Sequence, residues 1–143
     1  IARFLKTDNS GEVEILKRLP EMTLIPCRKN FGFVRSMDEE TKKECADYNR
    51  NLFLEAAELA KTADLVVFDE IMAAVNYGMV LEKDILDFLE NRPKKGEPDG
   101  LEIVLTGRNP SESLLGAADY VSEICKRKHP FDKRIMARRG VEY

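Results

Sequence analysis

The stretch ADLVVFDEIMAAVNY, residues 63–77, decides the fold of this chain. Its centre, LVVF at 65–68, is a continuous apolar run rich in β-branched residues, which predicts a strand buried on both faces. Strands of this kind belong to parallel sheets, and ligands bind at the carboxyl ends of those strands. Asp69 and Glu70 end the run, and a helical pattern follows as far as Tyr77. We therefore expect a strand, an acidic turn and a helix, with the acids where a ligand would bind.

The acidic pair has two interpretations. Two adjacent carboxylates are costly to bury unless a positive group meets them. A magnesium ion carrying a polyphosphate would be such a group, and the pattern is then the one called Walker B in P-loop nucleotide enzymes. Alternatively, Asp69 and Glu70 form an acidic strand end that only caps the next helix.

The composition predicts one globular domain over residues 1–143. Of the 143 residues, 43% are hydrophobic and 34% are charged, which is typical of a soluble protein with a core. The net charge of −3 argues against a nucleic-acid partner, and no apolar run is long enough to span a membrane. Cys27, Cys45 and Cys125 are far apart and suit reduced thiols in a cytoplasm, and the single His129 leaves no His/Cys zinc site.

Strand and helix patterns alternate along the chain. Strands are predicted at 1–6, 23–27, 65–68, 101–105 and 120–124. Helices are predicted at 12–19, from a Ser36/Glu39 capping box to about 63, at 71–77 and 82–91, and from an Asn109-Pro110 start onward. The alternation indicates an α/β fold with a mostly parallel sheet.

Charged and small residues follow three of the predicted strands. Lys6 follows the first strand, Asp69 and Glu70 the central one, and Thr106-Gly107-Arg108 the next. In a parallel sheet these residues share one edge, where the carboxylates suit a metal and the cations suit phosphate oxygens. The alternative is a salt-bridged surface edge. The phosphate-binding motif G-x-x-x-x-G-K-[ST] does not occur in these residues.

A loop at 28–35, RKNFGFVR, carries two aromatic residues in polar surroundings. Phe31 and Phe33 are either anchors packed onto the core or contacts for an apolar ligand. The sequence pattern leaves both interpretations open.

Taken together, the motifs resemble those of the P-loop type ATP:corrinoid (cob(I)alamin) adenosyltransferase family. The resemblance runs over essentially the whole chain, in the same order. The motifs are RFLK at 3–6, Gly11-Glu12, VVFDE at 66–70, NRP at 91–93, LTGR at 105–108, VSE at 121–123, KHPFD at 128–132 and GVEY at 140–143.

The resemblance implies a RecA-like P-loop fold, a mostly parallel sheet with helices on both faces. The implied enzyme is a transferase that moves the 5′-deoxyadenosyl group of ATP to the Co(I) of a reduced corrinoid, forming adenosylcobalamin and releasing triphosphate. Mg²⁺ accompanies ATP, a reduced flavoprotein is the expected electron donor, and the usual assembly is a homodimer. Because Co(I) is the nucleophile, the protein is expected to supply positioning and charge stabilisation.

Family roles carry over to individual residues. Glu70, with Asp69 beside it, matches the magnesium-site acids. Arg108 matches an arginine near the nucleotide, and Thr106, Gly107 and Lys6 join it as expected ATP-binding residues. Phe31 and Phe33 resemble the aromatic loop beneath the corrin ring, although some relatives have Trp in the second place. Lys128, His129 and Phe131 lie in a family motif without an assigned role.

Two departures from the family pattern bear on these roles. The family's P-loop is expected upstream of Ile1, and Met72-Ala73-Ala74 follow the acids where relatives often carry polar or aromatic residues. Two other functions stay open from the residues: another P-loop enzyme, either an ATPase or a small-molecule kinase, and a non-catalytic module that binds corrinoid or nucleotide.

Overall fold

The computed structural model describes residues 1–92, 100–136 and 138. A three-stranded sheet lies at its centre, with the strands in the order β1 (Ala2–Arg3), β2 (Leu65–Asp69) and β3 (Glu102–Leu105). Both strand pairs are parallel, with Ala2 opposite Phe68 and Phe68 opposite Leu105. The predicted α/β fold with a parallel sheet is therefore confirmed.

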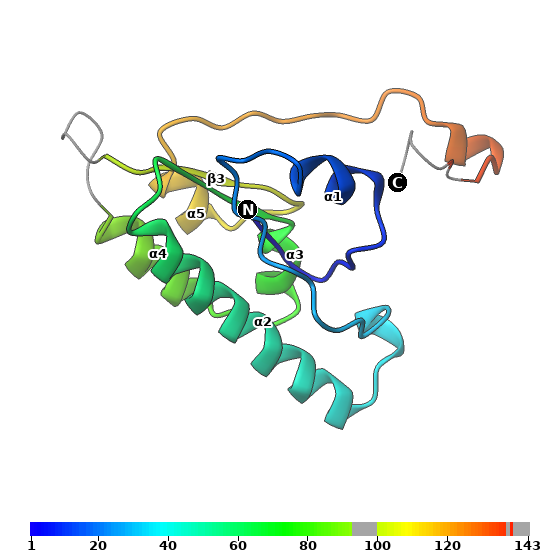
Figure 1. Cartoon of the computed structure of the whole chain (residues 1–143). Coiled ribbons are helices and arrows are strands. Elements are labelled where there is room, and N and C mark those ends of the chain that lie inside the picture. The colour runs from blue at the N-terminus through cyan, green and yellow to red at the C-terminus, as the bar shows by residue number, and fades with distance from the viewer. Residues whose placement is uncertain (93–99, 137, 139–143) are drawn as a thin grey trace.

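Helices connect and cover the strands. In chain order, the helices are α1 (Gly11–Leu16), a 3-10 turn η1 (Val34–Ser36), α2 (Glu39–Ala60), α3 (Ile71–Asn76), α4 (Glu82–Glu90), α5 (Glu112–Ala117) and a second 3-10 turn η2 (Pro130–Lys133). In Figure 1, α2 and α4 lie along one side of the sheet and α1 lies beyond the other. Helices thus occupy both sides, as the resemblance implied.

The main core lies between the sheet and helices α2 and α4. Phe68 on β2 is fully buried, and its ring lies 5.5 Å from that of Phe53 and 5.6 Å from that of Phe88. Phe4 adds a fourth ring, 6.1 Å from Phe68. Aromatic rings at these separations contribute packing energy beyond the area that they bury. The central strand is therefore fixed by the side chains of its inner face.

The outer face of β2 is only partly covered. Val66 and Phe68 are buried, but Leu65 is 53% exposed and Val67 is half-buried. Burial on both faces, predicted from the apolar run, is therefore wrong for Leu65. The run identified the strand correctly because β-branched residues favour a pleated surface whichever face is covered.

Two predicted helix starts lie two residues further along the chain in the structure. Asp38, not Ser36, caps α2, since its side chain accepts a hydrogen bond from the Thr41 amide at 2.7 Å. Ser111, not Asn109, caps α5 in the same way. Ser36 and Asn109 are residue types that cap helices about as well as Asp38 and Ser111, so residue type alone does not decide where each helix begins.

Two predicted strands are wrong. Residues 23–27 run beside the start of β1, where the Ile25 amide donates to the Ile1 carbonyl at 3.0 Å, but they form no strand. Pro26 lacks the N–H that would extend the ladder. Residues 120–124 are extended and exposed, with Ile124 98% exposed, and pair with no strand among the residues that the structure describes.

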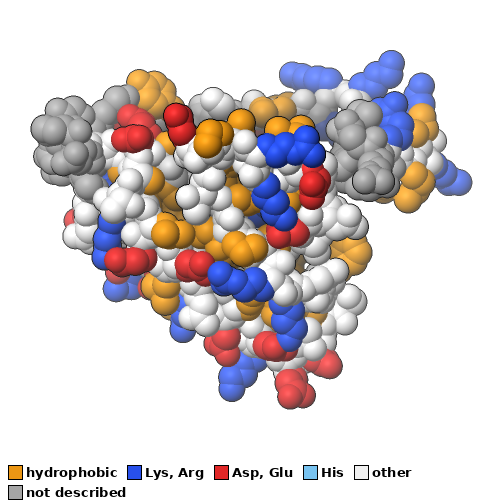
Figure 2. Space-filling view, viewed as in Figure 1, with side chains coloured by type: hydrophobic (Ala, Val, Ile, Leu, Met, Phe, Trp, Pro, Cys, Tyr) orange, Lys and Arg blue, Asp and Glu red, His pale blue; other side chains and the backbone are white. Residues whose placement is uncertain are grey.

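The segment from 119 to 136 leaves the sheet region after α5 and runs to η2 (Figure 1). Its exposed side chains include several cations, and Figure 2 shows basic side chains gathered on this projecting part. They are Lys126, Arg127, Lys128, Lys133 and Arg134. Within the described ranges, no helix is long and apolar enough to cross a membrane.

Candidate functional site

The acid pair lies where β2 gives way to α3. Asp69 is the last residue of the strand, and Glu70 follows with φ 61° in the left-handed region. Glu70 occupies the N-cap position of α3, yet its side chain makes no capping hydrogen bond. A left-handed conformation is uncommon for a residue with a Cβ, and such residues cluster at functional sites. The geometry therefore does not support the interpretation of Glu70 as only a helix cap.

Asp69 is held from two neighbouring strands. The Lys6 ammonium donates to Asp69 Oδ2 at 2.6 Å, and the Thr106 hydroxyl donates to Asp69 Oδ1 at 2.8 Å. Burial opposes the charge on Asp69, but the hydrogen bonds from Lys6 and Thr106 and the positive charge of Lys6 outweigh burial and lower the pKa of this carboxyl. Asp69 is therefore a carboxylate across the neutral range.

Thr106 also fixes the residue after Asp69. Its hydroxyl oxygen accepts a hydrogen bond from the Glu70 amide at 2.9 Å, while its hydrogen is directed to Asp69. One side chain from β3 thus sets the direction of Asp69 and the turn at Glu70. In the structure, therefore, the Thr106 hydroxyl makes hydrogen bonds within the protein. Its predicted ATP-binding role is not tested by these contacts.

Gly107 brings the loop after β3 against α3. Its φ is 133°, a conformation that L side chains rarely adopt, and a Cβ built there would lie 2.7 Å from Met72 Cβ. The Met72 amide donates to the Thr106 carbonyl at 3.3 Å. Glycine is required here for close packing against the helix, whereas the sequence suggested close approach to a ligand.

Arg108 follows on the same edge with its side chain exposed. Its backbone carbonyl accepts a hydrogen bond from the Asn76 amide nitrogen at 3.0 Å. The guanidinium has no hydrogen-bond partner among the described residues. The structure therefore brings Lys6 and Thr106 onto the acid pair. Gly107 packs on Met72, and the Arg108 backbone is attached at the far end of α3, so a shared binding role for these residues stays a prediction.

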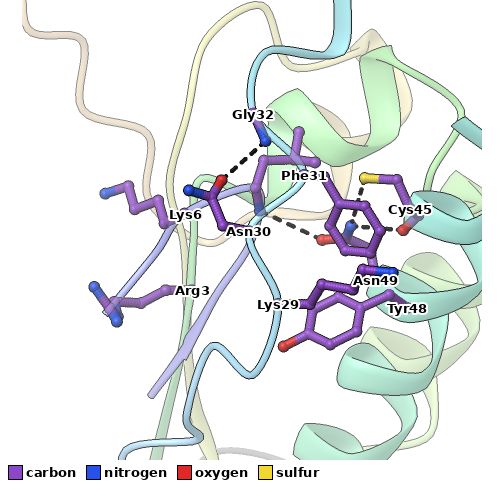
Figure 3. A pocket seen from close by; sticks show the side chains of 10 residues that line it. Arg3, Lys6, Lys29, Asn30, Phe31, Gly32, Cys45, Tyr48 and Asn49 are labelled. Carbon is purple, nitrogen blue, oxygen red and sulfur yellow. Dashed lines mark hydrogen bonds between the residues drawn. The ribbon is translucent and has the colours of Figure 1, made fainter. Parts of the chain in front are cut away.

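A small polar cavity joins this edge to the aromatic loop. Lys6 and Phe31 both line it, with Asn30, Tyr48 and Asn49 (Figure 3). The Phe31 ring lies 5.5 Å from the Tyr48 ring, and the Lys29 ammonium lies 4.9 Å from the Phe31 centroid. Phe31 is therefore anchored on α2 and also borders the cavity, and its contact with an apolar ligand stays a prediction.

Phe33 differs from Phe31 in its surroundings. Its side chain is 86% exposed and does not line that cavity. An exposed phenylalanine contributes little to folding stability, because burial of apolar area is the source of that stability. Of the two candidate aromatics, Phe33 is thus the one that is free to meet a ligand.

The chain matches the family model described as "ATP:corrinoid adenosyltransferase BtuR/CobO/CobP" over residues 1–143. The chain belongs to this family. The match confirms the resemblance that the motifs along the chain indicated.

Curated relatives carry the same description. A corrinoid adenosyltransferase of Sinorhizobium sp is 39% identical over 79 residues, 55% of this chain and 35% of the relative. Corrinoid adenosyltransferase CobA of Salmonella typhimurium is 32% identical over 80 residues, 56% of this chain and 38% of the relative. A corrinoid adenosyltransferase of Pseudomonas aeruginosa is 28% identical over 152 residues, which cover 100% of this chain and 68% of the relative. The first two matches span just over a third of the relatives' length.

Two buried polar residues to which the sequence analysis gave no role hold the chain near the candidate site. Asn49 is fully buried; its Oδ1 accepts from the Leu5 amide at 3.3 Å and its Nδ2 donates to the Cys45 carbonyl at 2.7 Å. Arg3 is 2% exposed and pairs with Asp8, which fixes the chain that follows β1. For Asn49 the only sequence signal was a polar residue inside an apolar pattern, whereas Arg3 lies in the RFLK motif.

The motif residues Lys128, His129 and Phe131 are exposed at η2. His129 Nδ1 accepts a hydrogen bond from the Phe131 amide at 3.1 Å, so the imidazole caps this short turn. The described residues therefore give His129 a local structural role and do not bring it to the acid pair.

The acid pair fits a magnesium ion that arrives with a polyphosphate. Mg²⁺ at such sites takes one or two carboxylates, with phosphate oxygens and water completing its six ligands. The Glu70 carboxylate makes no hydrogen bond or ion pair within the described ranges, and Asp69 retains further lone pairs. Among the residues that the structure describes, no three His, Cys, Asp or Glu side chains lie close enough together to hold a metal ion. A magnesium ion at the acid pair would therefore need the phosphate oxygens as further ligands.

The lowered pKa of Asp69 predicts a pH-dependent loss of stability. The charged carboxylate contributes stability that is complete above the usual pKa of an aspartate, about 3.9, and is lost as pH falls through the lower folded value. We expect the difference in unfolding free energy between wild type and Asp69→Asn to be largest near pH 7 and to shrink as the pH falls below about 4. Urea unfolding at stepped pH measures it. A difference that stays constant with pH would contradict this role for the charge.

Proposed function

We propose that this protein transfers the 5′-deoxyadenosyl group of ATP to the Co(I) of a reduced corrinoid, forming adenosylcobalamin and releasing triphosphate. Membership of the family supports this proposal. The observation that carries it in the structure is the position of Lys6, which contacts Asp69 and lines the same cavity as Phe31. One residue thus connects a nucleotide-type edge with an aromatic loop suited to a corrin ring.

The reaction needs no protein nucleophile. Co(I) attacks C5′ of ATP with an electron pair, the Co–C bond forms, and the C5′–O bond breaks so that triphosphate leaves with the bonding pair. Cobalt is oxidised to Co(III) and the adenosyl carbon is correspondingly reduced. The protein therefore has to align the two substrates and stabilise negative charge on the leaving group.

The cations on the sheet edge supply that stabilisation. Arg108 is exposed on the loop that follows Thr106 and would bind triphosphate oxygens, for which a guanidinium is well shaped. Lys6, now paired with Asp69, lies within reach of the same region. Mg²⁺ held through Glu70, with Asp69 beside it, would neutralise further charge on the phosphates.

The aromatic loop would receive the corrinoid. Phe31 is fixed against Tyr48, and Phe33 is two residues further on and exposed. Apolar rings beneath the corrin would displace the lower axial ligand, which leaves cobalt four-coordinate and easier to reduce. A reduced flavoprotein as electron donor, a homodimeric assembly and a cytoplasmic location complete the proposal, and these three rest on family resemblance and composition alone.

An anaerobic assay tests the proposed reaction. Chemically reduced cob(I)alamin is mixed with magnesium ATP and the natural-length protein, and the cobalt spectrum is followed while triphosphate is measured. We expect an alkylcobalt spectrum with an equal amount of triphosphate. ADP or phosphate as product would indicate an ATPase or kinase, and corrinoid binding with an unchanged cobalt spectrum would indicate a non-catalytic module.

Glu70→Gln should lower turnover by at least about tenfold, because it removes a carboxylate proposed to hold the ion. Its melting temperature should not change, since the Glu70 side chain makes no capping hydrogen bond. Asp64→Asn is the matched control: Asp64 is exposed and precedes the opposite end of β2. Turnover of Glu70→Gln equal to that of Asp64→Asn at saturating magnesium would remove the proposed metal role.

Phe33→Ala should raise the KM for cob(I)alamin roughly tenfold, the value of one buried aromatic contact, without changing the melting temperature. Phe31→Ala should raise the same KM and also destabilise the fold, by about 1 kcal/mol for the lost ring pair with Tyr48. Leu54→Ala, an exposed apolar residue on α2, is the control. If Phe33→Ala behaves like Leu54→Ala, Phe33 does not contact the corrinoid.

A further inference from the structure

Asn76 connects the end of α3 to the loop that carries Arg108. It is the last residue of that helix, and its Nδ2 lies 3.0 Å from the Arg108 carbonyl oxygen and 3.3 Å from the Asn109 carbonyl oxygen. Both partners are acceptors, so the amide nitrogen, not the oxygen, must face them. One side chain therefore holds two consecutive peptide groups, the one before Asn109 and the one after it.

The conformation that Asn76 holds is one that the loop does not favour by itself. Asn109 has φ 54°, in the left-handed region. A residue before proline prefers extended backbone, and Pro110 follows Asn109. Asparagine tolerates the left-handed region better than most residues, but the turn still needs support from its surroundings.

The opposite end of the loop is fixed independently. The Met72 amide binds the Thr106 carbonyl, and Gly107 packs directly on Met72. Arg108 thus lies between two attachments to the same short helix, one at each end of α3. The helix begins next to the acid pair, so these two attachments hold the backbone of Arg108 in a fixed position relative to Glu70.

We propose that Asn76 is a positioning residue for Arg108: by holding the carbonyls of residues 108 and 109, it directs the guanidinium toward the triphosphate of ATP. This inference rests on the proposed function, in which Arg108 binds the leaving group. Asn76 itself touches no substrate, and its contribution passes entirely through the backbone of the loop.

A double-mutant cycle with Arg108 tests the inference. Asn76→Ala removes both donors, and we expect the KM for ATP to rise about fivefold, the worth of one net hydrogen bond, with kcat changing less. Asn76→Asp has the same shape but cannot donate, so it should raise this KM at least as much. In an Arg108→Ala background, Asn76→Ala should have no further effect, because the group that it positions is gone.

Asn91→Ala is the matched control. The Asn91 amide also donates to a carbonyl at the end of a helix, that of Asp87 in α4, at 2.7 Å. The Asn91→Ala variant should leave the KM for ATP unchanged, and its melting temperature measures the stability lost with such a hydrogen bond. A KM of Asn76→Ala equal to wild type, or an equal rise with and without Arg108, would overturn the positioning role.

Failure of the wild type to yield alkylcobalt and triphosphate would instead overturn the proposed function, so the two failures are distinguishable.

Discussion

The hydroxyl of Thr106 is the interaction on which the candidate site depends. It donates to the Asp69 carboxylate and accepts from the Glu70 amide, so its donor and one of its acceptor positions are used between two parallel strands. This bridge joins the end of β3 to the end of β2 at the point where β2 gives way to α3. The Asp69 carboxylate and the turn at Glu70 take their positions from it.

The bridge also separates the two acids into different roles. Asp69 is paired with Lys6 and Thr106 and is therefore part of the framework. Glu70 is turned out of the strand by its left-handed backbone and makes no capping bond. Two adjacent carboxylates that look equivalent in the sequence are thus a structural anion and a candidate ligand. This division reduces the cost of burying both charges, because only one of them has to be compensated by the protein.

The sequence was informative where local pattern and burial coincide. The runs at 65–68 and 101–105 form β2 and β3, and the pattern after Glu70 forms α3. In these segments the spacing of apolar residues in the sequence matches the face that is buried in the fold. It failed where a long-range partner decides. The segment 120–124 has strand propensity, but propensity supplies no neighbour to pair with. The burial of Asn49 and Arg3 was not foreseen because Leu5, the partner of Asn49, and Cys27, a partner of Arg3, are distant in the sequence and meet them only after folding.

The contacts that build the acidic edge are all distant along the chain. Lys6 and Asp69 are 63 residues apart, and Asp69 and Thr106 are 37 apart. Closing such loops costs chain entropy before any contact is gained, so these bonds form together with the parallel sheet itself. A short fragment of the chain cannot assemble the edge, because its residues follow three different strands. A nucleotide bound at this edge in the way that we propose would stabilise the folded sheet, so it is expected to protect the chain from unfolding.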